Sequence, residues 1–306
     1  MIKRSFITAG LMAAFAMTGT TALAEECAER GALDAMFCDA NGDLVADAPT
    51  DESMLKDPST LVFAYTPVED PAIYEDIWTP FIDHLSEVTG KKVQFFAVQS
   101  NSAEVEAMRS GRLHIAGFST GPTPFAVNLA GVEPFAIMGS EDGQFGYKLQ
   151  VYTQADSDIK EMADLAGKRV AHTSPTSNSG NQAPRALFPD LGVVPDQDYE
   201  AAPVASEVVD RMAERGLYDP AEVRIVWESD PFPTTSYGVA HDLTPELKDK
   251  IKEAFFSYDF TGTALGEEFS GVSKFVPITY KDQWAVIRQI QSANGVEYTP
   301  QGLAAE

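Results

Sequence analysis

The stretch VQFFAVQSNSAEVEAMRSGRLHIAGFS, residues 93–119, places a helical pattern between two short apolar runs. The runs VQFFAV (93–98) and LHIAGFS (113–119) have the length and composition of buried strands. Between them, SAEVEAMRSG predicts a helix that opens at Ser102 and ends at Gly111. A strand, a helix and a second strand in this order predict a parallel sheet with helices on both faces.

The chain on either side extends this pattern. Upstream, LVFAYT (61–66) predicts another strand, and the apolar residues that follow it recur at helical spacing up to Val88. Downstream, YKLQVYTQADS (147–157) predicts a long strand that crosses into a second domain, where 158–174 would give a short helix, a turn at Gly167 and a strand. We expect a further helix at AAPVASEVVDRMAERG (201–216) and a strand at VRIVWES (223–229).

SYGVAHDL (236–243) would then return to the first domain, and helices near 245–258 and 282–295 would cover it. The sequence therefore predicts an α/β protein of two lobes with a cleft between them. The first lobe would comprise 59–148 and 237–306, and the second 149–236.

The N-terminus has the layout of a secretory signal peptide. Lys3 and Arg4 precede an apolar run that ends in small residues at Ala24, after which we expect cleavage. Residues 25–58 are predicted to be an acidic surface arm with little regular structure. Because an exported protein meets an oxidising compartment, Cys27 and Cys38 are expected to form a disulfide rather than a metal site.

The formal net charge of −24 argues against nucleic acid as a partner, because the few basic residues form no patch. Loss of Lys3 and Arg4 with the signal peptide would bring the charge to −26. The sequence contains no Gly-rich nucleotide loop and no cluster of histidines and carboxylates at metal-ligand spacing, so no cofactor is predicted.

Two loops are candidates for binding a small anion. HTSPTSNSGNQAPRALF (172–188) leads into a helix and concentrates short neutral donors, among them Thr176, Ser177, Asn178 and Ser179. GFSTGPTPFAV (117–127) offers Ser119 and Thr120 in the same position. Helix N-termini carry unsatisfied N–H groups and a partial positive charge, so two such loops in facing lobes could close on one anion. The alternative is that these residues serve only to cap the helices and to form the turns before them.

An enzymatic alternative is also open. Residues 117–121 match the G-x-S-x-G pattern of a hydrolase, with Ser119 as nucleophile and His172 or His241 as base. Pro122 and Pro124 delay the helix that such a serine needs directly behind it, which disfavours this reading.

From Leu61 to about Tyr298 the sequence resembles the substrate-binding proteins of phosphonate, phosphite and phosphate ABC transporters. The resemblance is carried by WTPFIDHL, EAMRSGRLHIAGF, GYKLQVYTQADS, DLAGKRVAHTSPTSNSGNQAPRALF and AAPVASEVVDRM. It implies a two-lobed, type II periplasmic binding-protein fold that closes on an oxyanion and presents it to a membrane permease. An unrelated small anion such as a sulfonate is the alternative within binding proteins. The chain would act as a monomer in the periplasm.

By the same resemblance, Ser177, Asn178 and Ser179 correspond to a Ser-Thr-Ser oxyanion motif, and Tyr147 to a ligand-contacting tyrosine. Asn101 replaces a cleft tyrosine of the relatives. Neutral Thr235 stands where members that take aminoalkylphosphonates carry an acid, although Glu207 falls on another acid on the amine side.

Relatives also carry about two dozen more residues, a strand and a helix, at the position of Tyr199–Ala201. We therefore expect the second lobe to be rearranged or destabilised.

Overall fold

The computed structural model describes residues 27, 30–66, 71–169, 172–198, 202–205, 213, 216 and 219–304. The predicted signal peptide and Glu207 lie outside these residues. Within the described residues, no helix is both long and apolar enough to cross a membrane.

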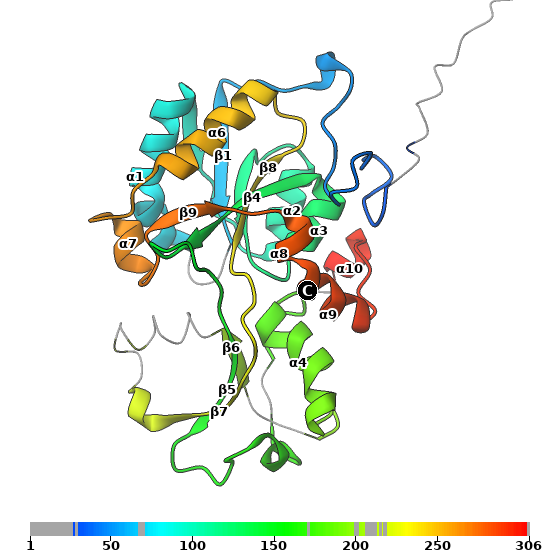
Figure 1. Ribbon diagram of the computed structural model, residues 1–306, viewed down its shortest axis with the longest axis vertical. Coiled ribbons are helices and arrows are strands. Elements are labelled where there is room, and N and C mark those ends of the chain that lie inside the picture. The colour runs from blue at the N-terminus through cyan, green and yellow to red at the C-terminus, as the bar shows by residue number, and fades with distance from the viewer. Residues whose placement is uncertain are drawn as a thin grey trace, which may run out of the picture.

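Two sheets divide the described structure into an upper and a lower lobe (Figure 1). The upper sheet has six strands in the order β2-β1-β3-β8-β4-β9. These strands are β1 (Thr60–Tyr65), β2 (Lys92–Phe95), β3 (Ile115–Phe118), β4 (Val132–Gly139), β8 (Ser236–Ala240) and β9 (Lys274–Pro277). The lower sheet has three strands in the order β6-β5-β7, namely β5 (Leu149–Gln154), β6 (Ala202–Ala205) and β7 (Val223–Glu228). A two-lobed α/β architecture with a mixed sheet is therefore confirmed.

The upper sheet is parallel only in its first three strands, which span residues 60–118. β1 pairs in parallel with β2 and β3, whereas β3–β8, β4–β8 and β4–β9 are antiparallel pairs. α1 (Pro71–Thr89) connects β1 to β2, and α2 (Asn101–Arg109) connects β2 to β3. Because such crossovers are right-handed and these two run in opposite directions across the sheet, the two helices lie on opposite faces.

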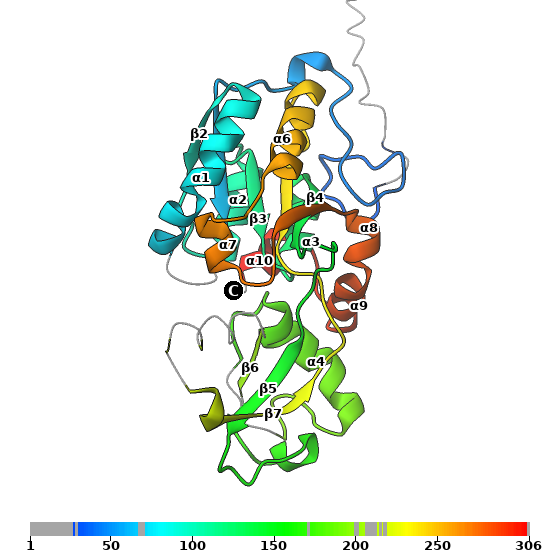
Figure 2. The ribbon, with the colours of Figure 1, turned by 60° about the vertical axis from the view of Figure 1, so that its left-hand side comes forward.

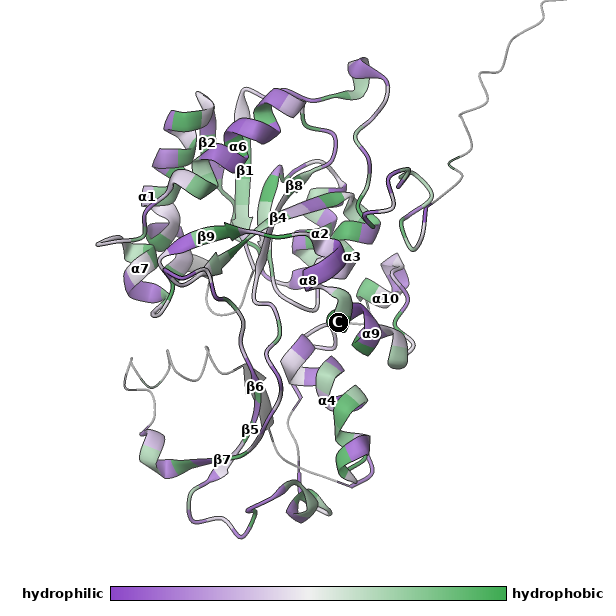
Figure 3. Ribbon diagram, in the orientation of Figure 1, coloured by the Kyte–Doolittle hydropathy of each residue, from purple (hydrophilic) through white to green (hydrophobic). Residues whose placement is uncertain are grey.

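Other helices complete the two faces of the upper lobe, as Figure 2 shows. α6 (Pro245–Ser257) and α7 (Ala264–Glu268) pack on α1, and α3 (Thr123–Ala130) packs on α2. The strands between them are mostly apolar and the outer helix faces mostly polar (Figure 3). Trp78, Phe63 and Tyr237 are fully buried in this first core.

A second core joins the lobes. It contains Val127 and Ile137 of the upper lobe, Leu149 and Phe188 of the lower lobe, and Trp284 from the C-terminal segment. That segment comprises α8 (Tyr280–Gln283), α9 (Ala285–Ala293) and α10 (Pro300–Ala304). The predicted return of the last helices to the first lobe is thus only part of what is found, because α9 also packs against α4 (Ala183–Leu187) of the lower lobe.

Three predicted elements differ in the structure. The helix expected from Ser102 begins at Asn101, because the Ser100 hydroxyl accepts the Ala103 N–H (3.1 Å) and is the N-cap. The long crossing strand is limited to β5, since the chain is irregular from Ser140 to Lys148. Residues Ala202–Ala205, expected in a helix, form strand β6 antiparallel to β5.

The expected strand before the 172–188 loop falls partly on residues outside the described ranges, and 172–174 are not in a strand. The lower lobe also contains short helical turns at Met162–Leu165, Phe188–Leu191 and Pro220–Glu222.

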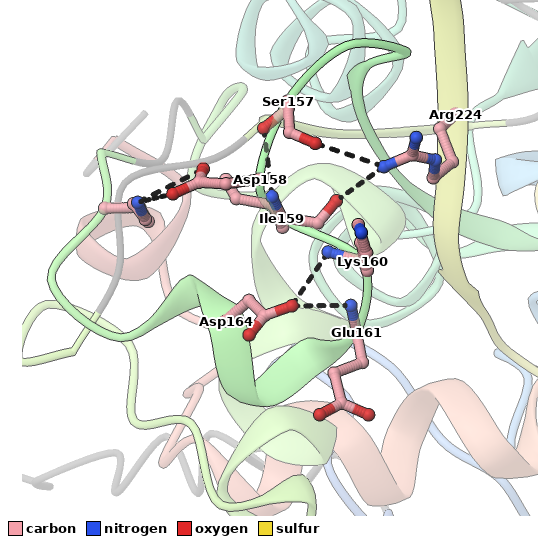
Figure 4. Close-up of polar contacts among 8 residues, drawn as sticks. Ser157, Asp158, Ile159, Lys160, Glu161, Asp164 and Arg224 are labelled. Carbon is pink, nitrogen blue, oxygen red and sulfur yellow. Dashed lines mark hydrogen bonds and ion pairs between the residues drawn. The ribbon is translucent and has the colours of Figure 1, made fainter.

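One loop of the lower lobe is organised by a single arginine. Arg224 on β7 donates to the carbonyl oxygens of Ser157 (3.3 Å) and Ile159 (3.1 Å), as Figure 4 shows. It also donates to the carbonyl oxygen of Ala155. Asp164 then accepts the N–H groups of Lys160 (2.9 Å) and Glu161 (3.2 Å). These contacts fix the loop 155–164, and Met162 and Leu165 beside them are buried in the second core.

The N-terminal arm docks on the upper lobe. Cys27 and Cys38 form a disulfide with their Cα atoms 5.5 Å apart, as the sequence predicts. Among residues 30–58 the one helical segment is a 3-10 turn at Glu52–Met54. Leu33 and Phe37 are buried in the second core, so the arm is packed rather than detached.

Candidate anion-binding site

The two loops singled out in the sequence meet where the lobes touch. The first, 119–122, connects β3 to α3. The second, 173–177, leads into a π-helical turn (Asn178–Gln182) and then α4. A methyl group on Gly121 would lie 2.9 Å from the backbone nitrogen of Asn178 and would overlap the carbonyl oxygen of Thr176. The loops are therefore in direct contact, and the lobes are closed on each other at this point.

Ser119 is held at the end of β3 by a polar cluster. Its hydroxyl donates to the Asn101 side-chain oxygen (3.2 Å), which also accepts the hydroxyl of Thr66 (3.0 Å). The cluster joins the ends of two parallel strands to the start of α2. Thr66 was missed in the sequence, although a polar residue directly after a parallel strand is a signal for this edge of a sheet.

Thr120 supports the crossing between the lobes. Its buried hydroxyl donates to the carbonyl oxygen of Pro233 (2.8 Å), so that proton is used within the protein. The backbone N–H groups of Thr120 and Gly121 have no acceptor among the described residues. Thr120 can therefore offer a ligand its N–H group more readily than its hydroxyl proton.

The second loop presents donors from its own backbone and hydroxyls. The Ser177 oxygen accepts the Gly180 N–H (3.2 Å), which leaves the hydroxyl proton available. Ser179 is a buried residue, and its hydroxyl makes no hydrogen bond in the part of the chain that the structure describes. The N–H groups of Asn178 and Ser179 also lack an acceptor there, as expected at the start of a helix.

Asn178 and Tyr147 connect this loop to the crossing segments. The Asn178 amide nitrogen donates to the Tyr147 hydroxyl (3.2 Å), and its side-chain oxygen, in a residue 2% exposed, has no partner among described residues. Tyr147 is buried and pairs with Phe232 through two backbone hydrogen bonds of 2.9 and 2.7 Å. Those two segments run side by side between the lobes in Figures 1 and 2.

The remaining predicted site residues are less closely placed. Thr176 is buried beside Gly121. Thr235 is half-buried, directly before β8, and no contact given by the structure joins it to the two loops. Glu207 lies outside the described residues.

The contacts described above for the loops 119–122 and 173–177 involve neutral groups. Arg185 on α4 donates to the Asn181 side-chain oxygen (2.8 Å) and pairs with Asp196 (2.5 Å). Burial and the Arg185 charge lower the pKa of His172, which therefore favours its neutral form near pH 7. Neutral donors of this kind can hold an anion through hydrogen bonds.

The structure does not assemble the alternative hydrolase site. Among the described contacts, the Ser119 hydroxyl bonds to Asn101 and to no histidine. His172 contacts Asn181 (3.0 Å between Nδ1 and Oδ1). His241 follows the opposite end of β8 from the Ser119 side of the sheet, about 15 Å along the strand. Metal chemistry has no candidate cluster either, since the described residues contain no group of three or more metal-ligating side chains suited to an ion.

Comparison with known families adds a direct match. The sequence profile described as "ABC transporter, phosphonate, periplasmic substrate-binding protein" matches residues 63–201 and 194–284. The two matched segments overlap at 194–201, next to the position at which the chain is expected to be shorter than its relatives.

Individual proteins agree in fold. The chain is 28% identical over 277 residues to the phosphate-import protein PhnD of Mycolicibacterium smegmatis, covering 79% of this chain and 85% of that protein. A binding-protein component of an ABC phosphonate transporter from Pseudomonas aeruginosa superposes with a TM-score of 0.66 at 21% identity, covering 81% of this chain and 93% of that one. PhnD1 from Prochlorococcus marinus, solved with methylphosphonate, gives 0.64 at 15% identity, with coverages of 78% and 99%.

Proposed function

The chain belongs to the family of periplasmic substrate-binding proteins of phosphonate ABC transporters, and from this premise we propose that it captures a small phosphorus oxyanion and delivers it unchanged to a membrane permease. The observation that supports this most directly is the contact between the two donor loops, at Gly121 and Thr176. An anion held there would receive hydrogen bonds from both lobes at once.

We assign the ligand contacts to the neutral donors at these tips. In the upper lobe these are Ser119 and the N–H groups of Thr120 and Gly121. On the crossing segment the donor is Tyr147, and in the lower lobe the donors are Thr176, Ser177, Asn178 and Ser179. A hydrogen bond to a charged group contributes about 1.5–3 kcal/mol, so five or six of them, less the costs of closure, suffice for micromolar or tighter binding.

The ligand class is a small tetrahedral anion: phosphate, phosphite or a short alkylphosphonate. The M. smegmatis relative is named for phosphate and the P. marinus structure holds methylphosphonate, which supports this range. Neutral Thr235 disfavours an aminoalkylphosphonate, with Glu207 as the one acid that could receive an amine. A sulfonate is the alternative anion.

We further propose that the chain is exported, loses residues 1–24 and works as a monomer without a cofactor. The boundaries 59–148 with 237–306, and 149–236, are our proposed division into lobes. The membership of the two sheets supports it.

Isothermal titration with phosphate, phosphite, methylphosphonate, 2-aminoethylphosphonate and methanesulfonate tests this function. We expect stoichiometric binding of at least one of the first three, weakened at least tenfold in Ser177→Ala and Ser179→Ala. The matched control is Ser292→Ala, an exposed serine on α9 whose side chain makes no described contact. Binding by none of the five would overturn the proposal, and turnover of an ester that is lost in Ser119→Ala would favour the hydrolase.

A further inference from the structure

The C-terminal segment supports the upper-lobe loop 119–122, which is called the upper-lobe tip below. Trp284 donates from its indole nitrogen to the carbonyl oxygen of Thr120 (2.9 Å), and Gln291 donates from its amide to the carbonyl oxygen of Gly121 (2.8 Å). Trp284 and Gln291 are both fully buried. They are seven residues apart, two turns of helix, and therefore face the same side.

These two bonds fix the orientation of the tip. A trans peptide places its N–H opposite its C=O, so holding the Thr120 carbonyl directs the Gly121 N–H away from α9. The Gln291 side chain is itself oriented, because its oxygen accepts the hydroxyl of Tyr298 (2.9 Å). The donors proposed for the ligand are thus set by residues far away in the sequence.

The same segment also reaches the lower-lobe tip. The Asn294 side chain, one residue past α9, donates to both the backbone oxygen and the side-chain oxygen of Gln182, each at 2.8 Å. Gln182 ends the π-helical turn that begins at Asn178. Figures 1 and 2 both place α9 between the upper lobe and α4.

The rest of the segment is attached to the upper lobe. Tyr298 packs edge-on against Phe125 of α3, with ring centroids 5.3 Å apart, and Ser102 of α2 donates to the Leu303 carbonyl (3.1 Å). Because the segment is anchored there, the Asn294–Gln182 bonds cross from one lobe to the other.

We propose that Asn294 is a positioning residue for ligand capture. It holds the lower-lobe loop against Gly121 in the closed state, without touching the ligand itself. Because these bonds exist only when the lobes are together, their loss accelerates opening and leaves the encounter with ligand unchanged. The consequence for ligand residence rests on the proposed function, whereas the consequence for lobe closure does not.

The test uses Asn294→Ala and Asn294→Asp in the full chain. Aspartate keeps the size of the side chain but cannot donate to the Gln182 oxygens, so it separates the hydrogen bond from packing. Stopped-flow measurement with the tightest oxyanion of the panel should show a dissociation rate raised about tenfold in both variants, with the association rate changed less than twofold. Ser292→Ala should behave as wild type. Equal dissociation rates in all four proteins would overturn the inference.

A second measurement does not require a ligand. Spin labels on Asp190→Cys in the lower lobe and Asp249→Cys on α6, both exposed, report the distance between the lobes. Without ligand, Asn294→Ala and Asn294→Asp should populate longer distances than wild type, and unchanged distributions would contradict the inference. If wild type binds no oxyanion but the variants open, the proposed ligand class fails while the role of Asn294 stands.

Discussion

At the scale of the residue, the site depends on small groups that leave space or an unused hydrogen bond. Gly121 allows the two lobes to touch because it has no side chain. Asn178 offers an amide, whose buried side-chain oxygen has no partner among the described residues. An unsatisfied buried acceptor costs about 1–3 kcal/mol, so a ligand or water that donates to it would recover that energy.

We expect Gly121→Ala to weaken oxyanion binding at least tenfold, because the added methyl overlaps the Thr176 carbonyl and keeps the lobes apart. Its φ is not in the left-handed region, so alanine is not strained locally. Titration calorimetry measures the effect, and the melting temperature of the ligand-free protein controls for folding. Unchanged affinity would mean that closure at Gly121 is not part of binding.

Asn178→Asp should abolish measurable oxyanion binding. The exchange keeps the size of the side chain but places a carboxylate, 2% exposed in the parent residue, at the tip that receives an anion. Gln289→Glu, the same charge change at an exposed position on α9, is the control and should bind normally. If Asn178→Asp kept its affinity for the oxyanion, Asn178 would not be a ligand contact.

At the scale of the element, apolar runs predicted β1, β2, β3 and β8 of the upper lobe. Most residues of β1, β3 and β8 are buried, whereas β2 lies at the edge of the sheet and is partly exposed. The secondary structure of the second lobe was harder to predict. Ala202–Ala205 was expected in a helix from its alanines and later apolar spacing, yet its backbone pairs with β5. Pro203 fits there because β6 is an edge strand, which tolerates a missing N–H.

The candidate site was predictable to the extent that it is local. Ser119 and Ser177–Ser179 follow strands and precede helices, a pattern visible in the sequence. Trp284, Gln291 and Asn294 were not predictable, because each acts on a loop more than 100 residues away. In the sequence, a buried tryptophan and glutamine at helical spacing indicate only a core face.

The contact between α6 and β4 should make stability depend on pH. Burial raises the pKa of Glu133, but Lys248 (2.8 Å) and Lys252 (2.7 Å) outweigh it and hold that pKa below its ordinary value of 4.5. A carboxylate with a lowered folded-state pKa stabilises the fold above the unfolded pKa, and this stability is lost as the pH falls through the folded value.

Glu133→Gln should therefore unfold about 1–3 kcal/mol more easily than wild type at pH 7, with the difference shrinking well below pH 4.5. Urea unfolding at the two pH values measures it. Glu246→Gln changes an exposed acid on α6, the helix that carries Lys248 and Lys252, and should show little effect at either pH. A difference between Glu133→Gln and wild type that persists in acid would assign the effect to packing.

At the scale of the whole molecule, an acidic protein is proposed to bind an anion. The net charge is −24, and the contacts described for the two loops involve neutral groups. Long-range repulsion acts on the approaching ligand, whereas hydrogen bonds at short range decide how long it stays. The core that runs through both lobes keeps those short-range donors in place.

Because repulsion acts on the approaching ligand and hydrogen bonds act on the bound one, the association and dissociation rates should depend differently on salt. Raising the ionic strength from 0.01 to 0.15 M shortens the Debye length from about 30 to about 8 Å, which screens the surface carboxylates from the ligand. We expect the association rate of phosphite or methylphosphonate to rise several-fold over this range, while the dissociation rate stays constant within twofold. Stopped-flow fluorescence of the native tryptophans measures both rates, with potassium chloride as the salt because chloride is not tetrahedral. An association rate that falls with salt would show instead that a local positive potential guides the ligand, and the neutral site proposed here would be wrong.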